Sequence, residues 1–175
     1  DENLDKNIID WSFDKKNNSN IIELFLFSRS KFTISNGSGI SNFTTLFRKP
    51  KFVVDFTQFY DLNTENSHFF PLLIPKIYRN KISNKLIKFS KVFHLGLDKM
   101  NTVEKISELG YEIVDNNEDE ILEGTKEMLD ILDNNHLHSS HNQKKFWDMV
   151  NEYSPNIEKY KISEYFYNKN KDLFL

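Results

Sequence analysis

The sequence predicts an α/β fold in which a Rossmann-like parallel sheet is flanked by helices. Residues 31–55, KFTISNGSGISNFTTLFRKPKFVVD, have the pattern of a strand, a loop, a helix and a second strand. Further short apolar runs at 71–75 and 111–114 alternate with segments of helical periodicity. Because a strand, a helix and a strand in succession favour a right-handed crossover, we expect the strands to be parallel.

The first unit of this fold is predicted in detail. Residues 31–35 alternate in polarity, and residues 51–55 form a β-branched and aromatic run after a proline. The helix between these strands should place an apolar stripe against the sheet. The stripe consists of Ile40, Phe43, Thr44 and Phe47. A preceding helix over about 21–30 is strongly apolar, and we expect it to be largely buried.

The remaining elements follow from capping and periodicity. We expect helices at 80–90, at 101–109 with a stop at Gly110, at 117–133 and at 140–153. The third of these helices begins with a capping box formed by Asn117 and Glu120, and Ser140 and Gln143 suggest a second one. Gly124 lies inside the third helix, where it permits close packing. The aromatic tail after residue 156 should either fold onto the domain or mediate association.

Composition restricts the function. The chain has 175 residues, about the size of one domain, and is 38% hydrophobic with 16 Phe. The formal net charge is −3, which disfavours nucleic acid as a partner. There is no Cys, so disulfides, thiolate metal sites and cysteine catalysis are excluded. No apolar run reaches the length of about 18 residues that spans a bilayer, and the first residues lack the apolar region of a signal peptide. The absence of Cys fits a cytosolic protein.

The join between the first strand and the first crossover helix is the candidate binding site. Gly37 and Gly39 can adopt positive φ and let a ligand approach the backbone. Free N–H groups of the first helical turn, at Ile40 and beyond, suit a phosphate or carboxylate. The alternative is a tight turn in which Ser38 or Ser41 caps the helix. Neither a dinucleotide fingerprint nor a P-loop is present.

Other polar residues are weaker candidates. Lys76, Tyr78, Arg79 and Lys81 form a cluster that could neutralise a diphosphate, although a solvated turn also explains Arg79 and Lys81. Polar residues of the loop at 56–70 could reach a sugar or a base, namely Gln58, Tyr60, Asp61 and His68. Asp115 and Glu104 could contact ribose hydroxyls. His136, His138 and His141 resemble a metal motif, but they lie in a polar inter-helix loop without Cys, and we expect no metal.

Four blocks of the sequence occur in the order IIELFLFSRSKFTISNGSGISNFTTLFRKP, LLIPKIYRN, ELGYEIVDNNEDEILEGTKEMLDIL and KISEYFYNKNKDLFL. Together they resemble the donor-binding half of GT-B glycosyltransferases, and more closely a family of bacterial glycosyltransferases associated with surface-polysaccharide synthesis. The resemblance implies the C-terminal domain of a GT-B fold with a helical C-terminal extension. It divides the chain into a Rossmann-like nucleotide-sugar-binding domain at 1–135 and the extension at 136–175, which packs on that domain.

The resemblance also implies a function. A nucleotide-sugar diphosphate would rest on Asn36, Gly37, Ser38, Gly39, Ile40, Ser41 and Lys76, where Lys76 is favoured because the family has a Lys after this proline. The sugar would pass to a glycan or lipid-linked acceptor without a metal ion or another cofactor. A missing N-terminal domain would bind the acceptor, and no catalytic residue is assigned here, so activity of the isolated chain is uncertain.

Two other functions stay open at this point. One is a non-catalytic Rossmann-like binding or assembly module that has kept the fold and lost donor binding. The other is a different α/β enzyme, such as a phosphatase or hydrolase, although no GxSxG elbow occurs. We expect a cytoplasmic protein, and a peripheral contact at the inner face of the membrane stays open.

Overall fold

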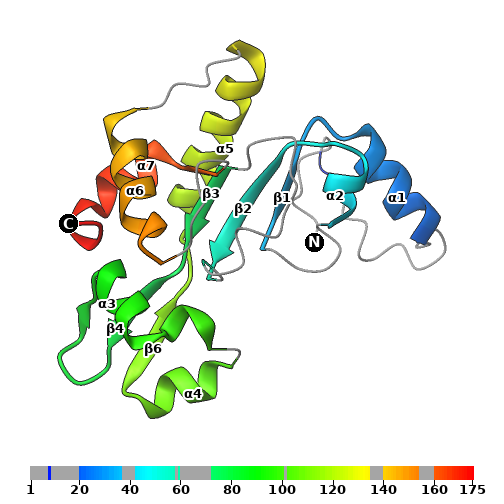
Figure 1. The fold of residues 1–175 in the computed structure, drawn as a ribbon. Coiled ribbons are helices and arrows are strands. Elements are labelled where there is room, and N and C mark those ends of the chain that lie inside the picture. The colour runs from blue at the N-terminus through cyan, green and yellow to red at the C-terminus, as the bar shows by residue number, and fades with distance from the viewer. Residues whose placement is uncertain are drawn as a thin grey trace.

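The described part of the chain contains two sheets, one parallel and one antiparallel, which are joined by a short connection (Figure 1). The computed structural model describes residues 8, 20–36, 42–57, 59, 72–100, 102–134, 140–153 and 160–175. Within these residues, the fold class is α/β with a parallel sheet flanked by helices, as the sequence predicts.

The parallel sheet has four strands. They are β1 (Thr33–Ser35), β2 (Lys51–Phe56), β3 (Leu72–Pro75) and β7 (Lys161–Ile162), in the order β1-β2-β3-β7. All three pairings are parallel, which confirms the parallel arrangement predicted for the first two strands. The strands are added in one direction along the sheet. The described strands therefore contain no reversal of order. Open α/β folds usually form their ligand crevice at such a reversal.

The first strand of the antiparallel sheet follows β3 almost directly in the chain. Lys76 separates β3 from β4 (Ile77–Asn80), which pairs with β5 (Lys85–Leu86) and β6 (Tyr111–Val114). The strand predicted at 111–114 is therefore present, but it belongs to this second sheet. Three short helices accompany the sheet: α3 (Phe89–Leu95), η4 (Leu97–Lys99) and α4 (Val103–Glu108). Thr102 caps α4 and Gly110 follows its end with φ 81°, as predicted.

The prediction of a helix at 80–90 is wrong. The chain instead makes a turn into β5, and Ile82, expected on an apolar face, is 92% exposed. The side chain of Asn80 explains the difference, because its Oδ1 atom accepts hydrogen bonds from the N–H groups of Ile82 and Ser83. An Asn side chain that binds the following N–H groups favours a turn over a helix. Asn84 completes the turn with φ 54°.

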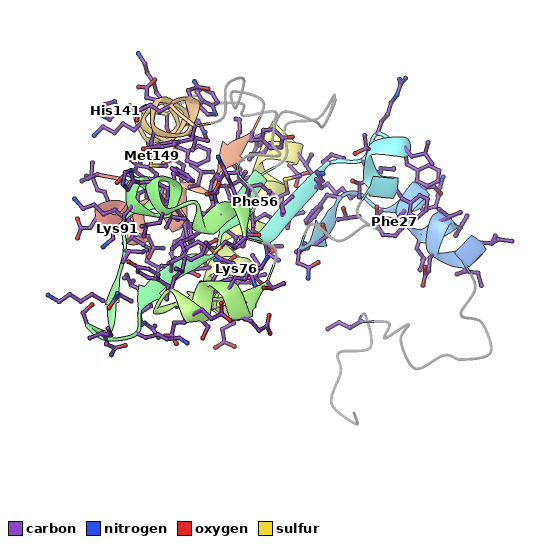
Figure 2. All side chains as sticks on the ribbon, turned by 60° about the horizontal axis from the view of Figure 1, so that its bottom comes forward. Phe27, Phe56, Lys76, Lys91, His141 and Met149 are labelled. Atoms are coloured by element: carbon purple, nitrogen blue, oxygen red, sulfur yellow. The ribbon has the colours of Figure 1, made fainter. Side chains whose placement is uncertain are left out.

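The expected burial of the first helix is also wrong. Helix α1 (Asn20–Arg29) forms nearly as predicted, but Ile21 is 77% exposed and Phe25 is exposed as well. Its apolar contact is with α2 (Asn42–Leu46), where the rings of Phe27 and Phe43 are 6.3 Å apart. Figures 1 and 2 show α1 and α2 beside the edge strand β1, apart from the body of the protein that carries Phe56 and Lys76. An edge strand of three residues gives these helices little surface to cover.

The predicted stripe of the first crossover helix is only partly directed to the interior. Thr44 is fully buried, whereas Phe43 is exposed and turns toward α1. Ile40 lies outside the described residues. The stripe therefore has two roles: Phe43 contacts α1, and Thr44 is directed to the interior.

Helix α5 (Glu118–Asn134) covers strands β2 and β3. Its predicted capping box is confirmed, because the Asn117 N–H donates to Glu120 Oε2 at 3.1 Å and the Glu120 N–H donates to Asn117 Oδ1 at 3.0 Å. Gly124 lies against the ring of Phe52, and both residues are buried. The absence of a side chain at Gly124 thus sets the distance between helix and sheet.

The C-terminal residues return to the parallel sheet. Helix α6 (His141–Asn151) precedes β7, and α7 (Glu164–Lys169) and η6 (Lys171–Leu173) follow it. Ser140 Oγ accepts the Gln143 N–H at 3.0 Å, but the buried Gln143 side chain bonds to Tyr160 O and the Ile162 N–H. The second capping box is therefore half formed, and its Gln ties α6 to β7.

The aromatic tail folds onto the domain, which is the first of the two predicted alternatives. Phe166, Tyr167 and Phe174 are buried, and the ring of Phe174 stacks on that of Tyr167 at 4.6 Å. The ring centroid of Phe174 also lies 4.8 Å from that of Phe89 in α3. The tail therefore joins the two sheets through a shared aromatic core.

Strand β7 lies within residues 136–175 and completes the parallel sheet. The division of the chain at residue 135 stays a prediction. Each helix in the described part of the chain is too short or too polar to cross a membrane.

Candidate functional site

A cavity of about 230 Å³ lies at the carboxyl ends of β1, β2 and β3. Asn36 follows β1, Asp55 and Thr57 stand at the end of β2, and Lys76 follows β3. The opposite wall comes from the second sheet and its helix, through Tyr78, Ile106 and Ile113. The chain passes from β3 to β4 through a single residue, so the second sheet stands over the ends of the parallel strands. In this position the second sheet forms one wall of a crevice, which in other open α/β folds arises from a reversal of strand order.

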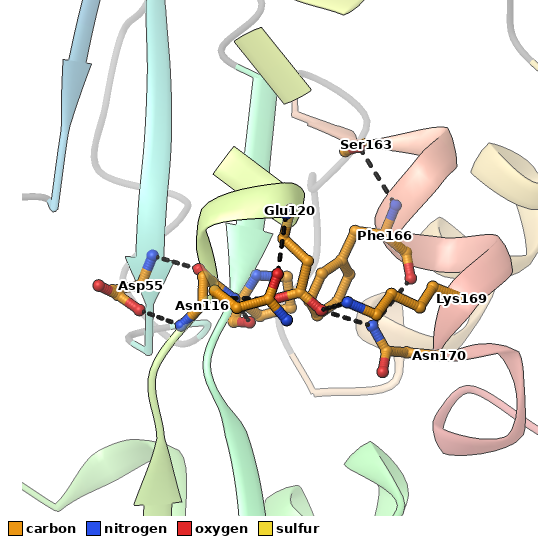
Figure 3. Close-up of polar contacts among 9 residues, drawn as sticks. Asp55, Asn116, Glu120, Ser163, Phe166, Lys169 and Asn170 are labelled. Carbon is orange, nitrogen blue, oxygen red and sulfur yellow. Dashed lines mark hydrogen bonds and ion pairs between the residues drawn. The ribbon is translucent and has the colours of Figure 1, made fainter. Parts of the chain in front are cut away.

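Asn116 fixes the connection between the sheets (Figure 3). Its side-chain Oδ1 atom accepts the Asp55 N–H at 2.7 Å, and its own N–H donates to Asp55 Oδ1 at 2.8 Å. Its Nδ2 atom donates to Pro75 O at 2.9 Å. Asp55 has φ 53°, a left-handed conformation that is uncommon for a residue with a side chain. The reciprocal hydrogen bonds hold it there.

Lys76 carries the positive charge of the cavity. Its Nζ atom lies 2.7 Å from Asp115 Oδ1, and the Asp115 side chain is 71% exposed. An ion pair this open to water is worth about 0 to 1 kcal/mol, because solvent screens the attraction. Lys76 can therefore leave Asp115 for a stronger anion at small cost.

The hydroxyl of Tyr78, a residue that lines the cavity, is buried and has no hydrogen-bond partner among the described residues. The same holds for Oδ1 of Asp98, which does not line the cavity. Burial raises the pKa of the Tyr78 hydroxyl, and the charge of Asp98 raises that pKa further. Tyr78 is therefore a protonated hydroxyl at neutral pH, able to donate a hydrogen bond. Burial also raises the pKa of Asp98, although its own backbone N–H and Lys99 oppose the shift.

The raised pKa of Asp98 predicts a pH-dependent cost. The folded state holds the Asp98 proton more tightly than the unfolded state, so stability falls as pH rises through the folded pKa. We expect Asp98→Asn to be more stable than the wild type at neutral pH, and the gain to shrink toward about pH 4, where unfolded carboxyl groups are protonated. Urea unfolding across this pH range measures the difference. Asp172→Asn, at an exposed position, is the control, and parallel pH profiles for wild type and Asp98→Asn would contradict the assignment.

The structure brings together two of the predicted site residues, Asn36 and Lys76, in one cavity. Gly37, Ser38, Gly39, Ile40 and Ser41 lie outside the described residues. So do the loop candidates Gln58, Tyr60, Asp61 and His68, and the histidines His136 and His138. Arg79 and Lys81 do not line the cavity; Arg79 pairs with Glu112 at 2.7 Å, and Lys81 donates to Ser107.

Asp55 and Asn116 are site residues that the sequence argument missed. Asp55 ends a predicted strand, so the rule that ligands gather at carboxyl ends could have found it. Nothing near Asn116 in the sequence indicates its partners. Asp115, predicted at a ribose, pairs with Lys76 instead in this structure. Within the described ranges, no group of three His, Asp or Glu side chains could hold a metal ion.

Comparison of the chain with protein-family models, with curated proteins and with solved structures finds no match. A function can therefore be inferred from two observations, the α/β fold and the position of the cavity at the carboxyl edge of its parallel sheet.

Proposed function

We propose that this chain is the donor-binding part of a GT-B glycosyltransferase, the C-terminal domain of that fold with a C-terminal extension. It binds the diphosphate of a nucleotide-sugar in the cavity at the carboxyl ends of β1, β2 and β3. One observation supports the proposal above the others. Asn36 and Lys76 were predicted from separate segments of the sequence, and both line this cavity.

The chemistry of the cavity suits a diphosphate. Lys76 exchanges its exposed partner Asp115 for the diphosphate, which carries more negative charge than one carboxylate. The protonated hydroxyl of Tyr78 is a second donor from the opposite wall. Residues 37–41 lie outside the described part of the chain, and the contribution of their N–H groups to the phosphate site stays a prediction from the sequence. Donors in this arrangement stabilise the charge that develops on the leaving diphosphate.

The size of the cavity indicates which part of the donor it holds. Sites for whole small molecules usually enclose about 300 to 1,000 Å³. A volume of about 230 Å³ accommodates the diphosphate and leaves the base and the sugar outside the described walls. The acceptor, a glycan or a lipid-linked sugar, binds on a separate N-terminal domain. Transfer proceeds without a metal ion, and the catalytic base belongs to that domain.

Thermal unfolding with nucleotide-sugars tests the proposal. We expect one of the UDP-, GDP-, CMP- or dTDP-sugars, at millimolar concentration, to raise the melting temperature, because a ligand that binds only the folded state stabilises it. Lys76→Met should remove most of this shift while keeping the aliphatic stem. Lys81→Met is the matched control, since Lys81 belongs to the same basic cluster and does not line the cavity. A shift that survives in Lys76→Met would refute the assignment of the diphosphate to this cavity.

The alternative is a non-catalytic binding or assembly module. The exposed apolar side chains of α1, Ile21 and Phe25 among them, favour this reading because such residues commonly mark contact surfaces. The absence of any shift with all four classes of nucleotide-sugar would support it over donor binding.

A further inference from the structure

A second cavity, of about 470 Å³, lies between α5, α6, β7 and α7. It shares no lining residue with the cavity at the carboxyl edge of the sheet. Its polar walls come mainly from Glu127 of α5, Lys161 of β7 and Glu164 of α7. Ile131 and Tyr165 add apolar surface.

Lys161 is the unusual member of this cavity. The residue is only 9% exposed, yet its ammonium group makes no hydrogen bond or ion pair with any residue that the structure describes. Pairing of β7 with β3 fixes its backbone opposite Leu72. Burial lowers the pKa of Lys161, and the charges of Glu127 and Glu164 oppose that shift. A buried stem thus holds an unpartnered donor at the cavity.

The nearby carboxylates, in contrast, are already held in place. Both Oε atoms of Glu127 accept the Glu164 N–H, at 3.0 and 3.2 Å. Glu164 Oε2 accepts Asn142 Nδ2 at 2.9 Å, and its Oε1 atom accepts the Ser140 hydroxyl. A carboxylate oxygen can accept more than one hydrogen bond. These groups therefore retain capacity for donors of a ligand.

The charges of the cavity favour a ligand that both accepts and donates hydrogen bonds. Four carboxylates, of Glu123, Glu127, Asp130 and Glu164, outnumber the ammonium groups of Lys126 and Lys161. An anion would meet this excess of negative charge, whereas a cation would be attracted by the carboxylates but would leave Lys161 without an acceptor. A hydroxyl group avoids both problems, because it accepts from an ammonium and donates to a carboxylate.

The shape of the wall adds a further requirement. The Tyr165 side chain is 38% exposed beside the polar groups, with Ile131 also lining the cavity. A ring of this kind offers a flat apolar face with a polar end. A ligand with several hydroxyl groups along its edge and C–H groups on its face matches the two surfaces together. A pyranose ring has this pattern.

We propose that this second cavity is a binding site for a neutral carbohydrate. The Lys161 ammonium donates to one ring hydroxyl, a neighbouring hydroxyl donates to Glu127 or Glu164, and the sugar face packs on Tyr165. The inference does not depend on donor binding at the other cavity, because the two sites have no residue in common.

Saturation-transfer NMR with the full chain tests the site. The probes are glucose, galactose, maltose and N-acetylglucosamine, with glucosamine and glucuronate as charged counterparts. We expect at least one neutral saccharide to receive saturation and to bind more tightly than the charged sugars. Lys161→Met keeps the buried stem and removes the donor, so it should weaken binding about tenfold or more, the usual effect of losing a hydrogen bond to a charged group. Lys105→Met, on the exposed face of α4, should bind as the wild type does.

A second variant guards against a folding defect in Lys161→Met. Tyr165→Ser changes a partly exposed side chain and should also weaken binding, with the melting temperature nearly unchanged. Lys76→Met should leave saccharide binding intact, which separates this site from the nucleotide-sugar cavity. The proposal is overturned if no neutral saccharide binds, if only a charged sugar binds, or if Tyr165→Ser binds with wild-type affinity.

Discussion

Replacing Gly124 with alanine should destabilise the protein, although alanine is the better helix former. A Cβ atom at this position would lie 2.3 Å from Phe52 Cζ and 2.9 Å from its Cε1 atom. Overpacking of a core costs about 1 to 3 kcal/mol, and larger side chains cost more. The gain from helix propensity is about 1 kcal/mol. Because the added Cβ atom would overlap the Phe52 ring, the cost lies in the upper part of that range, so we expect a net loss of about 1 to 2 kcal/mol for Gly124→Ala and a larger one for Gly124→Val.

Phe52 explains why the site cannot relax easily. Its side chain is fully buried on β2, which is an interior strand of the parallel sheet, and α5 packs on this strand. Urea unfolding of the two Gly124 variants measures the loss. Leu122→Ala, at an exposed position of the same helix, is the control and should change stability little.

A double-mutant cycle sharpens this test. Phe52→Leu alone removes buried surface and should destabilise, but in the Gly124→Ala background it makes room for the new methyl group. The two losses should therefore sum to more than the loss in the double variant. Strict additivity, or an increase in stability for Gly124→Ala, would show that the helix and the sheet are not in the contact described here.

The parts of the fold that the sequence predicted correctly depend on neighbouring residues. The capping box of Asn117 and Glu120 and the stop at Gly110 each lie within a few residues of the chain. The pairing of β1 with β2 required one short crossover. Each of these features is decided by local chemistry, so a pattern of a few residues is enough to indicate it.

Most of the missed features depend on residues far apart in the chain. The exception is the turn that replaces the helix predicted at 80–90, because the Asn80 side chain decides it locally. The exposure of α1 depends on whether other parts of the chain cover it. Strand β7 has two residues, Lys161 and Ile162, too few for a pattern. Asp55 and Asn116 are separated by 61 positions, and only the fold brings them together. Of the candidate site, the sequence therefore predicted Asn36 and Lys76, and it missed Asp55 and Asn116.

Loss of the Asn116 side chain should be the most damaging change at the connection between the sheets. Asn116→Ala leaves the Asp55 N–H and the Pro75 carbonyl without their side-chain partner. An unsatisfied buried group costs about 1 to 3 kcal/mol, and partial access to water places these two at the lower end. We expect a loss of about 2 to 3 kcal/mol in urea unfolding. Asn134→Ala is the matched control, because Asn134 is exposed and donates only to Asp130 of its own helix.

Asn116→Asp separates hydrogen bonding from side-chain size. The variant keeps an acceptor for the Asp55 N–H, loses the donor to Pro75, and places a second carboxylate beside that of Asp55. Repulsion between the two carboxylates should make it less stable than Asn116→Ala near neutral pH. A loss in Asn116→Ala no larger than in Asn134→Ala, or an Asn116→Asp variant as stable as the wild type near neutral pH, would show that this cluster does not hold the two sheets together. Because Asp55 and Lys76 line the donor cavity on either side of this cluster, its loosening should also weaken any nucleotide-sugar shift.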